Sequence, residues 1–179
     1  MNGAILAGGA GTRLGGLSKA MVELDGRPLA AHVAGALREV CDPVAVVCKA
    51  DTALPELPGV QRWDEPPEPR HPLTGIVHAL ERAGGPVLVC AVDMPWVTAD
   101  ACRSLLDAAP GGVAAVAAAE GELCPVFGVY APDALASLRK ARADAPLRET
   151  VAKLDPVRVA PPPPLLRSVN EQRDLQPEV

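Results

Sequence analysis

The sequence has few aromatic residues, no long apolar run and no cluster of basic residues. Aromatics make up 2% of the 179 residues, so the core has to be built from Ala, Val and Leu. Because the apolar runs are shorter than the roughly 18 residues of a membrane span, we expect no membrane association. The formal net charge is −5 with dispersed Lys and Arg, which argues against a nucleic-acid partner, since phosphate binding needs grouped cations.

The cysteine pattern and the overall composition indicate an ordinary folded domain. The five cysteines form no Cys-x-x-Cys pair and show no zinc-site spacing. The first residues lack the basic region of a signal peptide, so we expect a cytoplasmic protein with reduced, mostly buried thiols. With 49% apolar and 22% charged residues, the chain is expected to form a single domain over residues 1–179, and we expect a monomer.

Short apolar runs alternate with amphipathic stretches, which is typical of a parallel sheet covered by helices on both faces. The expected strands are residues 4–6, 44–48, 60–63 and 87–92, followed by an antiparallel pair at 113–117 and 125–130. The expected helices are residues 29–40, 76–83, 98–106, 133–140 and 146–154. Residues 161–164 are four prolines, which predict an extended surface segment rather than a helix or a central strand. The predicted fold class is therefore α/β.

A glycine-rich segment follows the first predicted strand, at the sheet edge where open α/β folds bind ligands. Residues 6–19 read Leu-Ala-Gly-Gly-Ala-Gly-Thr-Arg-Leu-Gly-Gly-Leu-Ser-Lys. Glycines bring backbone N–H groups close to a ligand, and Arg13 and Lys19 supply positive charge for a polyphosphate. The alternative is a flexible loop with two solvated cations. A Walker A loop is excluded because Leu17 follows Gly16, and Leu14 replaces the third glycine of a dinucleotide fingerprint.

A carboxylate ends a second buried strand, in the segment Val89-Cys-Ala-Val-Asp93-Met-Pro. Beside a cationic phosphate loop, Asp93 is suited to hold Mg²⁺, which binds through one or two carboxylates and substrate phosphates. The alternative is that Asp93 caps the next helix. Thr98 already offers that cap, so we favour the metal site.

Other candidate site residues carry weaker signals. Asp64 precedes a proline-rich loop, where acidic residues are common in turns. The segment Pro72-Leu-Thr-Gly75 lies at a helix entrance, where exposed N–H groups can face a base or an anion. Asn170, in Ser168-Val-Asn170, is equally well explained as a helix N-cap. Cys48 is the cysteine that could line a site, although burial is the simpler interpretation.

Together these segments resemble the molybdenum cofactor guanylyltransferase family over nearly the whole chain and in the same order. The matching motifs are Leu6-Ala-Gly-Gly, Arg13-Leu-Gly-Gly-x-x-Lys19, Asp64, Pro72-Leu-Thr-Gly75, Asp93-Met-Pro, Cys124-Pro-Val-Phe-Gly-Val-Tyr and Ser168-Val-Asn170. The resemblance implies a three-layer α/β/α fold of the nucleotide-diphospho-sugar transferase type. Its Rossmann-like sheet would be mostly parallel with one antiparallel strand.

The resemblance also implies an activity: GMP transfer from GTP to Mo-molybdopterin with release of pyrophosphate. The implied catalytic residues are Arg13, Lys19 and Asp93, with Mg²⁺ on Asp93. The implied nucleotide-binding residues are Leu6, Ala7, Gly8, Gly9, Lys19, Cys48, Asp64, Leu73, Gly75 and Asp93. Ser168 and Asn170 are candidates for contacts to the acceptor or to a metal-bound water. Molybdoenzymes or their chaperones are the protein partners that the resemblance suggests.

The sequence departs from the family at three candidate positions. Cys48 stands where Asn is frequent, His71 where Gly is frequent, and Ser168 where Asn or Asp is frequent. These departures affect recognition of the base and the acceptor more than phosphate chemistry. A cytidylyltransferase using CTP, a sugar-phosphate or phospholactate nucleotidyltransferase, and a non-catalytic nucleotide-binding module therefore remain alternatives.

Overall fold

The computed structural model describes residues 1–8, 18–142 and 145–175. In these ranges, one sheet contains seven strands in the order β5-β4-β1-β6-β8-β7-β9. Of these strands β8 alone runs in the opposite direction, being antiparallel to both of its neighbours. The strands are β1 (Asn2–Leu6), β4 (Val44–Cys48), β5 (Val60–Asp64), β6 (Val87–Ala91), β7 (Ala114–Ala119), β8 (Glu122–Tyr130) and β9 (Val157–Val159). The predicted mostly parallel sheet with one antiparallel strand is confirmed.

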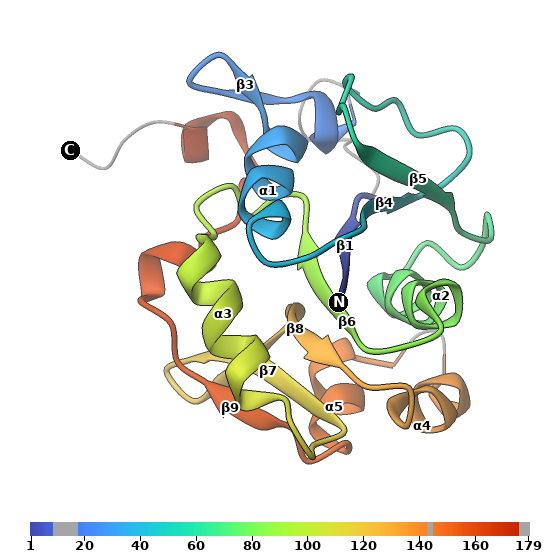
Figure 1. The fold of residues 1–179 in the computed structure, drawn as a ribbon. Coiled ribbons are helices and arrows are strands. Elements are labelled where there is room, and N and C mark those ends of the chain that lie inside the picture. Colours follow the sequence, from blue (N-terminus) through green and yellow to red (C-terminus); the bar gives the residue numbers. More distant parts are fainter. Residues whose placement is uncertain (9–17, 143–144, 176–179) are drawn as a thin grey trace.

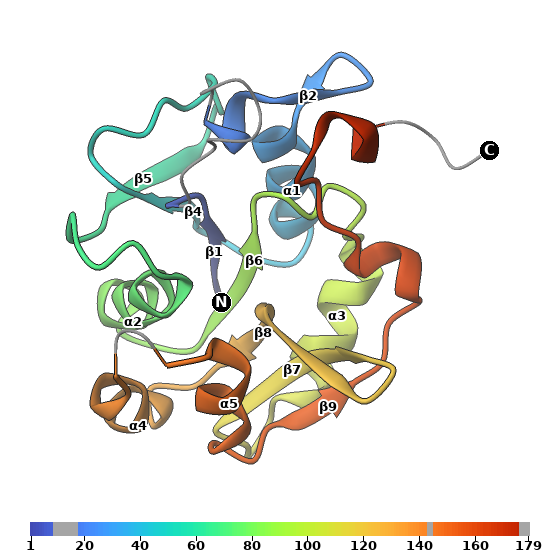
Figure 2. The same cartoon turned by 180° about the vertical axis from the view of Figure 1, so that it is seen from behind.

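Helices cover both faces of the sheet, which gives the predicted three layers (Figures 1 and 2). Helices α1 and α3 pack on one face, and α2, α4 and α5 pack on the other. The α-helices are α1 (Leu29–Arg38), α2 (Pro72–Ala83), α3 (Ala99–Ala108), α4 (Ala134–Lys140) and α5 (Leu147–Ala152). The 3₁₀ helices are η1 (Lys19–Met21), η2 (Pro163–Leu166) and η3 (Gln172–Leu175).

Alternation along the buried strands builds the two halves of the core. In β1, the Ile5 side chain joins the cluster under α1 and α3, while Ala4 and Leu6 join the cluster under α2. In β6, Leu88 and Val89 divide between the same two clusters. A strand buried on both faces has to be apolar throughout, which explains the continuous apolar runs in the sequence.

Strands β7 and β8 form the antiparallel pair expected from the sequence, but β8 contains a bulge. The register runs from Val116 opposite Gly128 to Ala117 opposite Cys124, so residues 125–127 have no partner on β7. The buried Tyr130 hydroxyl donates a 2.5 Å hydrogen bond to the Pro125 carbonyl inside this bulge. Proline is tolerated at a bulge because its missing N–H is not needed for the ladder.

Three elements differ from the sequence prediction. The proline segment is not entirely extended, because residues 163–166 form η2; proline fits the first turn of a helix, where its N–H would have no partner. A small hairpin of β2 (Glu23–Leu24) and β3 (Arg27–Pro28) turns at Asp25 and Gly26, both with positive φ. Strand β9 at the sheet edge was also not predicted.

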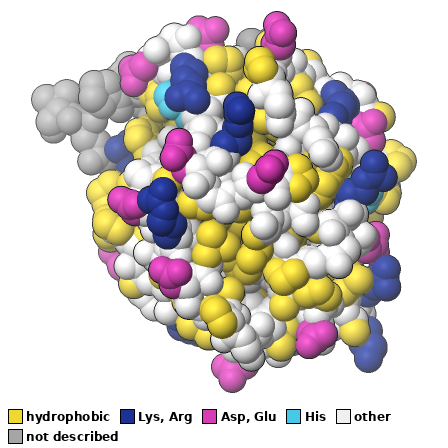
Figure 3. Space-filling view, viewed as in Figure 1, with side chains coloured by type: hydrophobic (Ala, Val, Ile, Leu, Met, Phe, Trp, Pro, Cys, Tyr) yellow, Lys and Arg dark blue, Asp and Glu magenta, His cyan; other side chains and the backbone are white. Residues whose placement is uncertain are grey.

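The surface seen in Figure 3 carries basic and acidic side chains interspersed with apolar ones. Within the described ranges, none of the helices combines the length and the apolar character needed to cross a bilayer.

Candidate functional site

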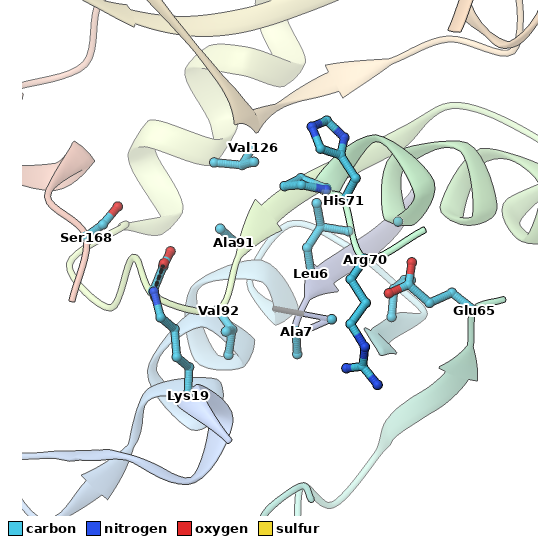
Figure 4. Close-up of a pocket in the computed structure, with 15 residues that line it drawn as sticks. Leu6, Ala7, Lys19, Glu65, Arg70, His71, Ala91, Val92, Val126 and Ser168 are labelled. Atoms are coloured by element: carbon cyan, nitrogen blue, oxygen red, sulfur yellow. Dashed lines mark hydrogen bonds and ion pairs between the residues drawn. The ribbon is translucent and has the colours of Figure 1, made fainter. Parts of the chain in front are cut away.

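A cavity of about 270 Å³ opens at the carboxyl ends of β1 and β6 (Figure 4). Strand β1 connects through α1 to β4 on one side, while β6 pairs with it on the other, so this edge is the point where a doubly wound sheet changes direction. The walls of the cavity come from several elements, among them β1, η1, β6, β8 and the loop before α2. They include Leu6, Ala7, Gly8, Lys19, Glu65, Arg70, His71, Gly75, Asp93, Val126 and Ser168.

Lys19, Asp93 and Asn170 converge at one end of the cavity from three distant parts of the chain. The Lys19 Nζ atom donates to Asp93 Oδ2 at 2.7 Å and to Asn170 Oδ1 at 2.8 Å. The side chains of Lys19 and Asp93 are each about one-fifth exposed, so the pair can be reached by a ligand. The amide nitrogen of Val169 donates to the Asp93 carbonyl at 2.8 Å, which fastens the Asn170 segment beside β6.

Neither Asp93 nor Asn170 caps a helix with its side chain; both side chains accept hydrogen bonds from Lys19 instead. Thr98 accepts from the Ala101 N–H and caps α3, as predicted, so Asp93 is free of that task. The Asn170 side-chain oxygen accepts from Lys19. Both side chains therefore present oxygen atoms to Lys19, at one end of the cavity.

A buried ion pair supports the opposite wall. Lys49 Nζ lies 3.4 Å from Glu65 Oε1, and the two side chains are 2% and 3% exposed. Burial raises the pKa of Glu65 above its ordinary value of 4.5, and the Lys49 ammonium partly opposes this shift. A Cβ atom on Gly8, two residues after the end of β1, would lie 2.1 Å from Glu65 Oε1, so the glycine leaves the space that the carboxylate occupies.

The loop before α2 shapes the rim of the cavity. His71, which replaces the frequent glycine, accepts a hydrogen bond from the Leu73 N–H through Nδ1 and caps α2. A Cβ on Gly75 would lie 3.0 Å from Leu6 Cδ2, so Gly75 allows α2 to approach β1. Arg70 lies at the rim and pairs with Asp51 at 3.1 Å.

Three of the predicted nucleotide-binding side chains lie outside the cavity wall formed by the described residues. Cys48 is fully buried in the core under α1, and burial raises the pKa of its thiol to about 11. Asp64 is exposed at the end of β5 and pairs with Arg62 at 2.7 Å. Leu73 packs in the core under α2. Gly9 and Arg13 lie outside the described residues.

Sequence reasoning missed Glu65 and Lys49, which line or support the cavity. Glu65 directly follows Asp64, which was predicted to bind the nucleotide, but Glu65 itself falls in the proline-rich segment 65–69, where an acidic residue is common in turns. The signal for Lys49 was its place after Cys48 at the end of a buried strand, but a single lysine there is not specific. Val126 was missed because the bulge that turns it toward the cavity is not visible in the strand pattern.

The oxygen atoms at the Lys19 end of the cavity suit a hard cation. Asp93 and Asn170 offer a carboxylate and an amide oxygen, and both lie within hydrogen-bond distance of one cationic nitrogen. Mg²⁺ prefers such oxygen ligands and takes others from water and substrate phosphates. Within the described residues, no group of three or more His, Cys, Asp or Glu side chains is arranged to hold a metal ion. The set present fits a metal that is shared with a bound nucleotide.

Comparison with known proteins identifies relatives of this chain. The chain is 34% identical to the molybdenum cofactor guanylyltransferase of Pseudomonas putida over 165 residues, 84% of each chain. It is 39% identical to the protein of that name from Cereibacter sphaeroides over 138 residues, covering 72% of this chain and 67% of that one. The Archaeoglobus fulgidus molybdopterin-guanine dinucleotide biosynthesis protein A superimposes with a TM-score of 0.72 at 22% identity, covering 98% and 95%. The sequence model of the MobA-like NTP transferase domain matches residues 3–157, and the chain therefore belongs to this family.

Proposed function

We propose that this protein is a molybdenum cofactor guanylyltransferase, which transfers GMP from GTP to Mo-molybdopterin and releases pyrophosphate. The observation that carries the proposal is the convergence of Lys19, Asp93 and Asn170 beside a cavity at the end of β1. The names of the curated relatives support the choice of nucleotide and acceptor. The reaction itself is nucleotidyl transfer, which fits the family to which the chain belongs.

The chemistry follows from the charges of the reactants. An oxygen of the pterin phosphate attacks the α-phosphorus of GTP in line, and the bond from that phosphorus to the bridging oxygen of pyrophosphate breaks. Because the attacking phosphate is already ionised, no side chain has to act as a nucleophile or a general base. The protein has to hold several anions together, which requires positioning and positive charge. The Lys19 ammonium supplies that charge, and Arg13 is proposed to add to it.

We infer that Asp93 and Asn170 hold Mg²⁺ when GTP is bound. The ion would neutralise charge that develops on the phosphate oxygens. Lys19 now donates to both oxygen atoms, so it has to turn from them toward the phosphates when a cation binds there. Ser168 lines the same end of the cavity, where its hydroxyl can contact the acceptor or a coordinated water.

The test is pyrophosphate release from the purified protein with Mg²⁺, molybdopterin and each of the four nucleoside triphosphates in turn. Release with GTP alone is expected. Release with CTP alone would change the assignment to a cytidylyltransferase. Tight nucleotide binding without release would indicate a non-catalytic module. Release with a sugar phosphate or phospholactate in place of molybdopterin would indicate a different acceptor.

A further inference from the structure

Glu65 carries a carboxylate oxygen that the described residues leave without a hydrogen bond. The Oε2 atom is buried and has no hydrogen-bond partner among the described residues. Buried carboxylate oxygens without a donor are rare, because removing them from water costs free energy that only a hydrogen bond restores. A ligand that brings a donor to this point would remove the cost.

The carboxylate is held in a fixed position by its neighbours. Lys49 pairs with Oε1 and also donates to the carbonyls of Pro66 and Pro69, so all three ammonium hydrogens have acceptors. The Glu65 N–H donates to the Cys48 carbonyl at 2.9 Å, which continues the pairing of β5 with β4. Lys49 therefore uses one oxygen of Glu65 and leaves the other free for a ligand.

The Oε2 atom of Glu65 faces the part of the cavity that lies between the end of β1 and the start of α2. Figure 4 shows the Glu65 side chain directed from the end of β5 toward Leu6 and Ala7. A Cβ on Gly75 would lie 3.4 Å from Oε2, and one on Gly8 would collide with Oε1. The carboxylate thus lies between Gly8 and Gly75. Because neither residue has a side chain, a ligand can approach the backbone on both sides of the carboxylate. The phosphate-binding lysine lies at the other end of the same cavity.

We propose that the Oε2 atom of Glu65 recognises the guanine base by accepting hydrogen bonds from its N1–H and its 2-amino group. This inference rests on the proposed function and names the residue that selects the nucleotide. A carboxylate is an acceptor only, so it matches an edge that presents two adjacent donors. Guanine has such an edge. Cytosine offers one amino donor beside an acceptor nitrogen, and uracil offers one N–H between two carbonyls, so the carboxylate disfavours both.

The first experiment needs no variant and uses analogues of GTP on the wild-type protein. Inosine triphosphate lacks the 2-amino group, and N1-methyl-GTP lacks the N1–H. We expect kcat/KM for pyrophosphate release to fall at least about tenfold with either analogue, the loss of one hydrogen bond to a charged group. Equilibrium binding of GTP and ITP is measured alongside. Equal binding of GTP and ITP would overturn the inference whether or not the protein turns over.

The second experiment assigns the preference to the residue. Glu65→Gln keeps the shape and an oxygen for Lys49 but brings an N–H₂ group that repels the guanine donors. We expect its preference for GTP over ITP to fall to about one, while the exposed neighbour variant Glu68→Gln keeps the wild-type preference. An unchanged preference in folded Glu65→Gln would overturn the role of Glu65. Wild-type protein that binds GTP selectively but releases no pyrophosphate would contradict the proposed function and leave base recognition by Glu65 supported.

Discussion

Replacing Lys19 with Met should separate catalysis from stability. The substitution keeps the length of the side chain but removes the charge that pairs with Asp93 at 2.7 Å and the bond to Asn170 at 2.8 Å. Because the Lys19 and Asp93 side chains are about one-fifth exposed, water can replace the ammonium. The free energy of unfolding should therefore fall by only about 1 kcal/mol, a shift in melting temperature of about 2–4 °C.

Turnover should respond far more strongly than stability. An ammonium that stabilises the transferring phosphate is expected to contribute about 10²–10³ in kcat. The assay is pyrophosphate release at saturating GTP and molybdopterin, with calorimetry on the same samples. Lys140→Met, at an exposed position on α4, is the matched control and should keep full turnover. If folded Lys19→Met retained more than a tenth of wild-type turnover, the role assigned to Lys19 would be wrong.

Three further predictions concern other parts of the structure. Gly8→Ala places a Cβ 2.1 Å from Glu65 Oε1. We therefore expect the unfolding free energy to fall by about 1–3 kcal/mol and a fluorescent GTP analogue to bind more weakly. Gly85→Ala adds a Cβ in open space and should change neither quantity. Because the pKa of Glu65 is raised above 4.5, the folded protein binds that proton more tightly than the unfolded chain, and stability should fall as pH rises above this value. Urea unfolding from pH 4 to pH 8 should therefore show Glu65→Gln gaining stability relative to wild type as pH rises, with no such trend in Glu68→Gln. Tyr130→Phe removes the buried hydroxyl that donates to the β8 bulge and should lower the unfolding free energy by about 1–2 kcal/mol in the same assay.

Most of the central sheet could be predicted because its strands are buried on both faces. Runs such as residues 44–48 and 87–91 are apolar throughout, and a buried parallel strand leaves little choice of residue. The short hairpin was missed although Asp25-Gly26 is a recognised turn pair, because the strands on either side have two residues each. Strand β9 is three residues long and half exposed, so its sequence carries almost no periodicity.

The end of the candidate site at Lys19 and Asp93 was more predictable than the end at Glu65. Lys19 and Asp93 belong to motifs that follow β1 and β6, and the topology of the sheet brings the ends of these two strands together. The end at Glu65 depends on the contact of this residue with Lys49, and the two are close in space because β5 pairs with β4 in a particular register. Neither residue belongs to a motif that the sequence would reveal. Their ion pair joins the residue after β4 to the residue after β5. Pairing between distant segments cannot be recognised from composition or local pattern.

The β8 bulge determines which side chain in this wall of the cavity can be varied. Residues 125–127 have no partner on β7, yet the ladder continues on both sides of them, and Val126 faces the cavity. Pro125 and Phe127 are buried, and Phe127 pairs with Cys90 on β6, so Val126 is the bulge residue that can be exchanged while the alignment of β7 with β8 is preserved. One position in the wall of the cavity can therefore be varied without disturbing the core, and a library randomised at Val126 alone is the way to change the shape of the cavity.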